Sequence, residues 1–341
     1  MKRILLIATG GTIASTEDGN GLSPALTGEE LAQSVPEISG LCELDVVQPM
    51  NIDSTNMRPS DWMQIRDVIV EGYADHDGFV ILHGTDTMSY TAAALSYLIQ
   101  DSPKPIVLTG AQKPIWFDGT DSKRNLTDAF LYACRGCGGV QIVFNGKVIL
   151  GTRARKTCSK SFQAFSSVNY PDLAVLQDER LLQYIRTESL PRPVFYDKLC
   201  ENVGLLKLIP GTKPELVEFM TQHYDGLIIE SFGVGGLPCY EQADFLSAAA
   251  AWSSAGKPIV ITTQVPHEGS DLAVYQVGAR AAAQPGILQA YTMTVEAVVT
   301  KLMWILPQTR DLTEIKRLFY APIACDLLQF EERGQEIDES H

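Results

Sequence analysis

Short apolar runs rich in β-branched residues alternate with longer helical patterns through the first half of the chain. The apolar runs predict strands at Ile4–Ala8, Leu44–Val47, Phe79–Leu82 and Ile106–Leu108. Between them, apolar residues spaced by three and four predict helices at Pro59–Tyr73, Met88–Gln100 and Ser122–Cys134. Alternation of this kind predicts an α/β domain built on a doubly wound, mostly parallel sheet.

Two further apolar runs, Val140–Phe144 and Val148–Gly151, flank the dipeptide Asn145-Gly146. Asn and Gly tolerate positive φ at both central positions of a tight turn, so the two runs predict an antiparallel hairpin. Lys156 follows shortly after its second strand.

The periodicity fades from about Arg180 to Asn202, where Pro191 and Pro193 flank Arg192, and this composition indicates an interdomain connection. A second α/β pattern follows, with strands at Val203–Leu208, Gly226–Ile229 and Pro258–Thr262 and helices near Pro214–His223, Glu241–Ala255, Asp271–Ala283, Val295–Leu306 and Leu312–Tyr320. A length of 341 residues also favours two domains. We expect a larger N-terminal α/β catalytic domain (residues 1–185), a linker (186–202) and a smaller C-terminal α/β domain with a parallel sheet (203–341).

The composition is that of a folded globular chain, with 45% hydrophobic and 20% charged residues. A net charge of −14 argues against a nucleic-acid partner, which requires clustered Lys and Arg, and the dense basic stretch Arg153–Lys160 is short. The N-terminal apolar run ends at Gly10-Gly11, too early for a signal peptide, and no run approaches the roughly 20 residues that span a bilayer. We expect a cytoplasmic protein that does not associate with membranes.

Seven cysteines, an odd number spread over a long chain, favour reduced thiols over a disulfide framework. Cys134 and Cys137 have CxxC spacing, but they fall late in a predicted helix, and neither a second CxxC nor a histidine pair completes a zinc site. We expect neither a metal nor a cofactor.

Polar clusters follow four of the predicted strands, at the carboxyl ends where open α/β sheets bind their ligands. The clusters are Thr9-Gly10-Gly11-Thr12, Asn51-Ile52-Asp53-Ser54-Thr55, His83-Gly84-Thr85-Asp86-Thr87 and Thr109-Gly110-Ala111-Gln112. Glycine beside a hydroxyl lets a ligand approach the backbone, whose N–H groups can hold an oxyanion or a carboxylate. Each cluster alone also fits an ordinary turn or helix cap. The four together favour a ligand site.

Two long motifs contain most of these polar residues: Ala8-Thr9-Gly10-Gly11-Thr12-Ile13-Ala14 and Gly78-Phe79-Val80-Ile81-Leu82-His83-Gly84-Thr85-Asp86-Thr87-Met88. Shorter motifs are Asp53-Ser54-Thr55, Lys156 and Gly233-Val234-Gly235-Gly236. With these residues the chain resembles the bacterial L-asparaginases, specifically their cytoplasmic type I group, over nearly its whole length.

The resemblance implies an amidohydrolase without cofactor or metal that converts L-asparagine to L-aspartate and ammonia through an acyl-enzyme intermediate on Thr12. A threonine hydroxyl is a poor nucleophile unless a neighbouring base takes its proton, and Thr85, Asp86 and Lys156 correspond to the group that manages this proton. The residues that correspond to the family's substrate-binding set are Gly11, Asp53, Ser54, Thr55, Gly84, Thr85, Asp86 and Ala111.

Within that set, the resemblance gives individual positions distinct tasks. Ser54 and Asp86 match the residues that bind the α-carboxylate and α-amino groups of the substrate. The backbone of Gly11 and Thr85 would polarise the substrate carbonyl, and the carbonyl of Ala111 would face the amide that is lost. Family members build each site across a two-fold interface, so we expect a homodimer or homotetramer in which the loop Gly233–Gly236 borders a neighbour's site.

Other interpretations stay open. Leu22 stands where many asparaginases carry a tyrosine, on the loop Ser15–Leu26, so a loop hydroxyl is missing. His83 invites a general-base role, but a histidine at a strand end is more often structural, and the resemblance gives it no proton to transfer. The same fold serves a subunit of an amidotransferase that supplies ammonia to tRNA-linked substrates, for which an extra N-terminal domain is expected. An amino-acid sensor without turnover is the non-enzymatic alternative.

Overall fold

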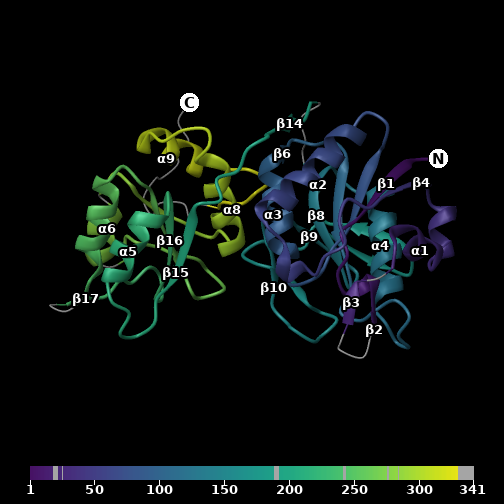
Figure 1. Ribbon diagram of the computed structural model, residues 1–341, viewed down its shortest axis with the longest axis horizontal. Helices are drawn as coiled ribbons and strands as arrows, with labels where there is room; N and C mark the ends of the chain where they lie inside the picture. Colours follow the sequence, from purple (N-terminus) through teal and green to yellow (C-terminus); the bar gives the residue numbers. More distant parts are fainter. Residues whose placement is uncertain are drawn as a thin grey trace, which may run out of the picture.

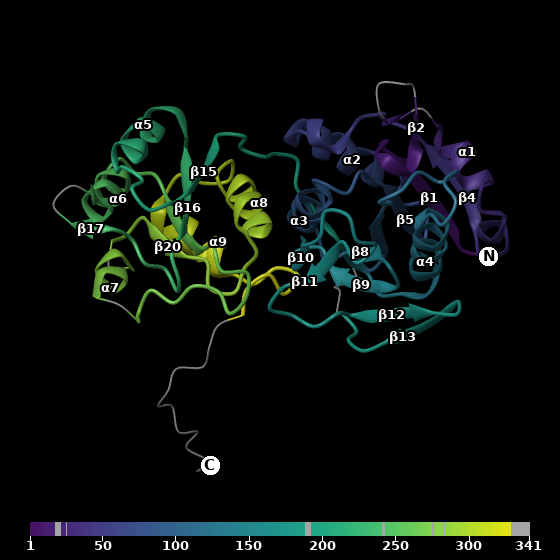
Figure 2. The same cartoon turned by 90° about the horizontal axis from the view of Figure 1, so that it is seen from below.

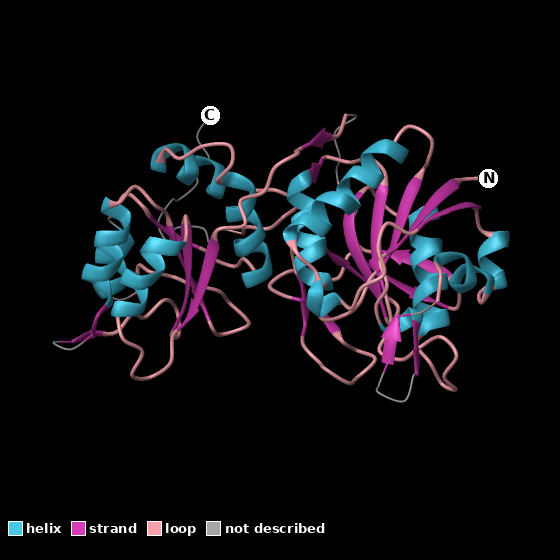
Figure 3. Ribbon diagram, in the orientation of Figure 1, coloured by secondary structure: helices cyan, strands magenta, loops and turns pink. Residues whose placement is uncertain are grey.

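The computed structural model describes residues 1–17, 22–24, 26–187, 192–240, 243–274, 276–282 and 284–328. Two α/β domains of unequal size lie beside each other, the larger formed by the first half of the chain (Figure 1). In both, helices pack around a central sheet (Figure 3). The predicted fold class is confirmed.

The larger domain contains an eight-stranded sheet in the order β13-β12-β9-β8-β7-β5-β1-β4. Its strands are β1 (Arg3–Ala8), β4 (Glu43–Val47), β5 (Gly78–Leu82), β7 (Pro105–Thr109), β8 (Gly139–Phe144), β9 (Lys147–Leu150), β12 (Ala174–Gln177) and β13 (Arg180–Gln183). The five strands from β4 to β8 are parallel, and the remaining three are antiparallel to their neighbours. The four strands predicted first in this half are all present, within one residue at each end.

Helices cover both faces of this sheet, because alternate strand residues point to opposite sides. Ile4 and Leu6 of β1 pack with α4 (Ser122–Arg135) in one buried cluster, on the side that also carries α1 (Gly28–Gln33). Leu5 and Ile7 pack on the other side, with α2 (Pro59–Gly72) and α3 (Met88–Leu98). This two-sided arrangement explains why β5 and β7 are buried at every position.

The β8–β9 connection is the predicted hairpin. The two strands are antiparallel, and Asn145 and Gly146 have φ values of 49° and 75°. Both central residues of the turn therefore occupy the left-handed region that a type I′ turn requires.

The smaller domain contains a four-stranded parallel sheet, β15 (Val203–Lys207), β16 (Gly226–Ser231), β19 (Ile259–Thr263) and β20 (Ile287–Gln289). Its helices are α5 (Glu215–His223), α6 (Phe245–Ser254), α7 (Gln276–Ala282), α8 (Val295–Ile305) and α9 (Leu312–Tyr320). Two of the predicted helices begin later than expected. Asp244 caps α6 by accepting from the Ser247 N–H, so this helix starts after Asp244 rather than near residue 241, and α7 starts at Gln276 rather than near residue 271.

Shorter elements complete the described chain: β2 (Ser15–Glu17), β3 (Leu22–Pro24), β6 (Ile99–Gln100), β10 (Ala154–Lys156), β11 (Phe165–Ser167), β14 (Val194–Phe195), β17 (Cys239–Tyr240), β18 (Ala243–Asp244) and the 3₁₀ turns Thr12–Ala14, Pro36–Gly40 and Ser54–Asn56. Inside the expected linker, β14 pairs with β6. This pairing ends α3 at Leu98, two residues before the predicted end.

The two domains share a buried contact. Ala94 and Tyr97 of α3 pack in one cluster with residues of α8, among them Val298 and Trp304. The chain after α9 then returns to the larger domain, where it reaches the segment that enters β10 (Figure 2). Among the described residues, no helix is both long and apolar enough to cross a membrane.

Candidate active site

The candidate site forms where β1, β5 and β7 end side by side in the sheet. The first loop is tied to its neighbour at once, since Thr9 donates its hydroxyl hydrogen to the Leu82 carbonyl at 2.8 Å. Gly10 bridges to Ile52 of the loop after β4. The first two predicted polar clusters are thus in contact, and the first also bonds the residue that precedes the third, as their position at one sheet edge requires.

The loops after β1 and β5 touch through two glycines. A Cβ atom on Gly11 would lie 2.5 Å from both the Cα and the N of Gly84, and Gly11 has a φ of 83°. Any other residue would therefore push the two loops apart. This contact places Thr12 and Thr85, the next residue on each loop, on adjoining segments.

Lys156 joins the site from β10. Its Nζ lies 2.7 Å from Thr85 Oγ1 and 2.7 Å from Asp86 Oδ1. The Lys156 side chain is 16% exposed, whereas that of Asp86 is 56% exposed. The Lys156 side chain is therefore largely shielded from solvent, whereas the side chain of its partner Asp86 is open to it.

Gln112 completes this chain of hydrogen bonds. Thr85 donates its hydroxyl hydrogen to Gln112 Oε1 at 3.2 Å while it accepts from Lys156, so the hydroxyl is bonded on both sides. The sequence interpretation included Gln112 in the fourth polar cluster but assigned it no role. The signal was its place directly after Ala111; the sequence does not reveal that its side chain turns toward Thr85.

The Asp53-Ser54-Thr55 segment meets the loop after β5. Ser54, only 2% exposed, accepts a hydrogen bond from the Asp86 N–H at its Oγ, at 3.3 Å, and its carbonyl accepts from the Thr87 hydroxyl at 2.8 Å. Asp53 instead accepts from the N–H and the hydroxyl of Thr55, at 2.8 and 2.9 Å. Ser54 therefore lies beside Asp86, while Asp53 and Thr55 hold the shape of their own turn.

The backbone N–H groups at the site differ in whether they already donate a hydrogen bond to another part of the backbone. The Gly11 N–H donates to the Ile52 carbonyl at 3.1 Å, so the expected polarising role of Gly11 requires that bond to be shared or exchanged. Within the described chain, no backbone acceptor takes the N–H of Thr12 or of Thr85. Ala111 lies buried two residues after the end of β7, at the same edge of the sheet.

His83 is fully buried, and both of its ring nitrogens are hydrogen-bonded, Nδ1 with the Gly84 carbonyl at 2.7 Å and Nε2 with the Thr91 hydroxyl at 2.9 Å. Burial lowers the pKa of His83 to about 4, although the Gly84 bond opposes this shift. The ring is therefore neutral at physiological pH and braces the loop that carries Thr85. This is the structural role expected for it.

The remaining predictions concern the loop Ser15–Leu26, the loop Gly233–Gly236 and metal binding. The side chain of Leu22 and part of the loop Ser15–Leu26 lie outside the described residues. The loop Gly233–Gly236 forms a closed turn after β16 in the smaller domain, where Gly236 pairs with Phe232. Where the chain is described, no three His, Cys, Asp or Glu side chains gather as metal ligands, and Cys134 and Cys137 are free thiols.

Both halves of the chain match known protein families. Residues 3–188 match the family model described as "Asparaginase, N-terminal", and residues 202–319 match "Glutaminase/Asparaginase C-terminal domain". The chain belongs to the asparaginase family. Among its curated relatives, the L-asparaginase of Thermococcus kodakarensis is 38% identical over 331 residues, covering 95% of this chain and 99% of the relative. A subunit of the glutamyl-tRNA(Gln) amidotransferase of Pyrococcus furiosus is 32% identical, covering 96% and 77% respectively.

Solved asparaginase structures share the whole fold. The L-asparaginase from Thermococcus kodakarensis superposes with a TM-score of 0.90 at 36% identity, covering 96% of this chain and all of its own. L-asparaginase I from Vibrio cholerae gives 0.86 at 29% identity, covering 96% and 99%. A probable cytoplasmic L-asparaginase from Campylobacter jejuni gives 0.81 at 26% identity, covering 94% and 99%. These matches place the chain with the type I asparaginases, as the resemblance of its motifs implied.

Proposed function

We propose that the protein is an L-asparaginase that hydrolyses L-asparagine to L-aspartate and ammonia, with Thr12 as its nucleophile. The observation that supports this proposal best is the position of Lys156, whose Nζ bonds both Thr85 and Asp86 at 2.7 Å beside the loop of Thr12. A threonine hydroxyl is a weak nucleophile that needs a neighbouring base, and a lysine with a carboxylate and a second hydroxyl can provide a path for its proton.

In the proposed reaction, Thr12 Oγ attacks the side-chain carbonyl carbon of asparagine and its proton passes to Thr85. Thr85 hands a proton on to Lys156 along the bond that already joins them, once the lysine is neutral. Collapse of the tetrahedral intermediate breaks the C–N bond, and the leaving nitrogen takes a proton to depart as ammonia. Water then attacks the resulting ester. This hydrolysis releases aspartate and returns a proton to the Thr12 hydroxyl.

Substrate binding is assigned to groups at the same sheet edge. Ser54 and Asp86 lie next to each other and would bind the α-carboxylate and the α-amino group, which selects a free amino acid over a peptide. The N–H groups of Thr12 and Thr85 are available for the developing oxyanion, and loss of one such donor costs roughly 10²–10³ in turnover. The remaining assigned residues, Gly11, Asp53, Thr55, Gly84 and Ala111, shape this pocket.

An ammonia-supplying subunit is the second candidate, because a glutamyl-tRNA(Gln) amidotransferase subunit matches almost the whole chain. The T. kodakarensis L-asparaginase favours the first, since it is 38% identical and matched over 99% of its length, whereas the P. furiosus amidotransferase subunit is 32% identical and matched over 77%.

The proposal also covers the oligomeric state, the cellular location and the linker between the domains. We assign a homodimer or homotetramer, a cytoplasmic location and a linker at residues 186–202. The name of the Campylobacter jejuni structure supports the location. The two family matches, which end at residue 188 and begin at residue 202, support the linker.

The decisive experiment measures ammonia release from L-asparagine, L-glutamine and a peptide amide by the wild type, Thr12→Ala and Thr221→Ala. Thr221 lies on α5 of the smaller domain and serves as a matched threonine control. We expect asparagine to be the best substrate, Thr12→Ala to be inactive and Thr221→Ala to match the wild type. Hydroxylamine should divert the acyl-enzyme to β-aspartyl hydroxamate. A wild type inert on all three amides would refute the proposal.

A further inference from the structure

A cavity of about 410 Å³ lies between the larger domain and the segment that follows α9. It lies at the edge of the sheet where β8 begins and β9 ends, whereas the candidate active site occupies the edge where β1, β5 and β7 end. Its volume falls in the roughly 300–1,000 Å³ range of small-molecule sites. The lining residues used below are Ile99, Asp101, Gln141, Leu150, Arg186 and Cys325.

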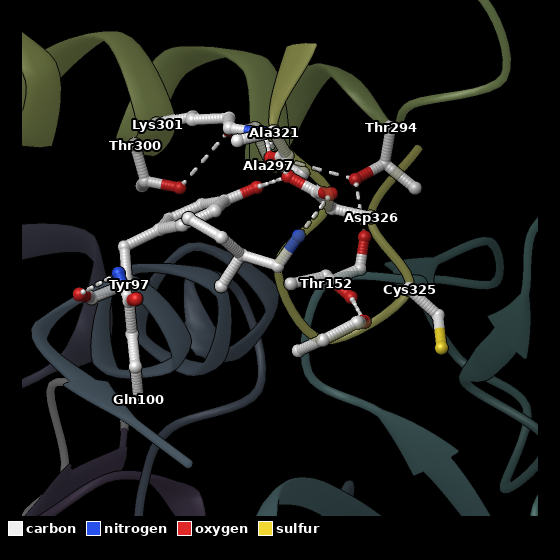
Figure 4. A network of polar contacts seen from close by, with 12 residues as sticks. Tyr97, Gln100, Thr152, Thr294, Ala297, Thr300, Lys301, Ala321, Cys325 and Asp326 are labelled. Atoms are coloured by element: carbon white, nitrogen blue, oxygen red, sulfur yellow. Dashed lines mark hydrogen bonds and ion pairs between the residues drawn. The ribbon is translucent and has the colours of Figure 1, made fainter. Parts of the chain in front are cut away.

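One wall of this cavity is held rigidly by a buried ionic network (Figure 4). Residues 322–325 form that wall, and Asp326 follows them directly. Asp326 and Lys301 are both fully buried and lie 2.7 Å apart, and Tyr97 of α3 donates its hydroxyl hydrogen to Asp326 at 2.9 Å. The wall is therefore fixed to both domains before any ligand is present.

Three residues at the cavity have polar groups that the described residues leave open to a ligand. Gln141 is fully buried, and its Oε1 accepts no hydrogen bond from the described residues, although its Nε2 donates to the carbonyl of Gly138 at the cavity wall. A buried acceptor without a donor costs roughly 1–3 kcal/mol, which a bound N–H or O–H group would recover. Arg186 and Asp101 are exposed lining residues, and neither forms an ion pair within the described part of the chain.

We propose that this cavity is an effector site for an amino acid with a large apolar side chain that ends in a hydrogen-bond donor. Arg186 would bind the α-carboxylate and Asp101 the α-ammonium group. Apolar walls that include Ile99 and Leu150 would surround the side chain, and its donor would bond Gln141 Oε1 once that buried side chain turns toward the cavity. Tyrosine and tryptophan carry such a side chain, whereas phenylalanine lacks the donor.

The chain connects this cavity directly to Lys156. Leu150 lines the cavity, and six residues later the chain reaches Lys156. Midway, Thr152 donates to the Ala324 carbonyl at 2.7 Å, and Arg153 donates to the Cys325 carbonyl at 2.6 Å. A ligand against the wall at 324–325 therefore changes the support of the segment that positions Lys156.

The first test measures binding of L-tryptophan, L-tyrosine and L-phenylalanine to the full-length protein by calorimetry. We expect tryptophan and tyrosine to bind at least tenfold more tightly than phenylalanine, with saturating L-aspartate present as well as absent. Because binding is measured without turnover, the result is independent of whether the protein hydrolyses asparagine. No binding, equal binding of all three, or displacement by aspartate would overturn the site.

Variants and chemical protection locate the ligand. Arg186→Ala should weaken tryptophan binding at least tenfold, while Arg180→Ala, an exposed arginine of β13 that does not line the cavity, should leave it unchanged. Bound tryptophan should slow alkylation of Cys325 but not of the exposed Cys158 and Cys239, which serve as internal references. Unchanged affinity in Arg186→Ala, or equal alkylation of Cys325 with and without ligand, would contradict the assignment.

The second test concerns the coupling to Lys156 and rests on the proposed asparaginase activity. Saturating tryptophan should change kcat at least twofold with little change in KM, and Arg186→Ala should abolish this response while keeping its basal rate. A ligand that binds the cavity and leaves kcat unchanged would refute the coupling. An enzyme inactive in every condition would instead refute the proposed function.

Discussion

Breaking the buried pair Lys301–Asp326 should strongly destabilise the protein. Both side chains have no exposure and their charged atoms lie 2.7 Å apart. Burial lowers the pKa of Lys301, and Asp326 opposes that shift. Asp326→Asn keeps the shape of the side chain but removes its negative charge, so the buried ammonium group is left with neutral partners such as the Ala321 carbonyl at 2.8 Å. A buried charge left without its partner costs roughly 3–5 kcal/mol, and we expect a loss of this size in the free energy of unfolding.

The double variant separates the ion pair from the rest of the side chain. In a Lys301→Met background the partner charge is already gone, so the added Asp326→Asn substitution should cost much less than it does alone. The two changes should therefore couple by a few kcal/mol in a double-mutant cycle, as groups in one buried network do.

Urea unfolding followed by tryptophan fluorescence and circular dichroism measures these energies. Trp304 is a local reporter, because its ring stacks on Tyr97 at 6.1 Å between centroids. The exposed pair Arg317–Glu314 on α9, at 2.6 Å, provides a matched control, and Glu314→Gln should leave the unfolding free energy nearly unchanged. A cost of Asp326→Asn no larger than that of Glu314→Gln, or simple additivity of the two network substitutions, would contradict this prediction.

Four further outcomes are expected. Thr12→Ala should abolish ammonia release but retain aspartate binding, and more than a few per cent of residual activity would refute the assignment of the nucleophile. Lys156→Met should lower kcat by orders of magnitude with little change in KM, as for a group that acts in the transition state, and an unchanged rate would remove Lys156 from the mechanism. Exhaustive chelation should leave activity intact, which a metal-restored loss would contradict. The pKa of His83, about 4 when folded against 6.5 unfolded, means that only the unfolded chain takes up this proton as pH falls from 6.5 to 4, so stability should drop by about 3 kcal/mol across that window. Urea unfolding of His83→Asn at the same pH values should give a flatter profile.

The longer strands and helices follow from the local pattern of apolar and polar residues, so they could be predicted from the sequence. The inner parallel strands β1, β5, β7 and β8 are buried on both faces along nearly their whole length, and each reads as an apolar run. The turn at Asn145-Gly146 could be predicted because both residues tolerate positive φ. Strands of two or three residues are different, because their identity depends on a partner elsewhere. β14 exists through its pairing with β6, and β20 through its pairing with β19, and no local signal reveals either.

The candidate site likewise has features that could be predicted from the sequence and features that could not. The polar clusters after consecutive strands could be assigned to one sheet edge from the sequence alone, because parallel strands end there together. The Thr85–Gln112 bond and the engagement of the Gly11 N–H depend on side-chain and backbone orientation between loops. Asp326 lies beyond the last predicted helix, so nothing around it in the sequence indicates that a lysine and a tyrosine from two domains surround it.

Because the chain returns to the larger domain after α9, some contacts of that domain can form only late in synthesis. Arg153 and its acceptor at Cys325 are 172 positions apart, and Tyr97 and Asp326 are 229 apart. At roughly 5–20 residues per second, the ribosome adds Cys325 about 10–35 s after Arg153. During that interval the nascent larger domain can form its sheet, but the segment before Lys156 still lacks its outer support. The emerging protein therefore gains its final arrangement at Lys156 only after Cys325 has been added, and a shorter nascent chain lacks this support.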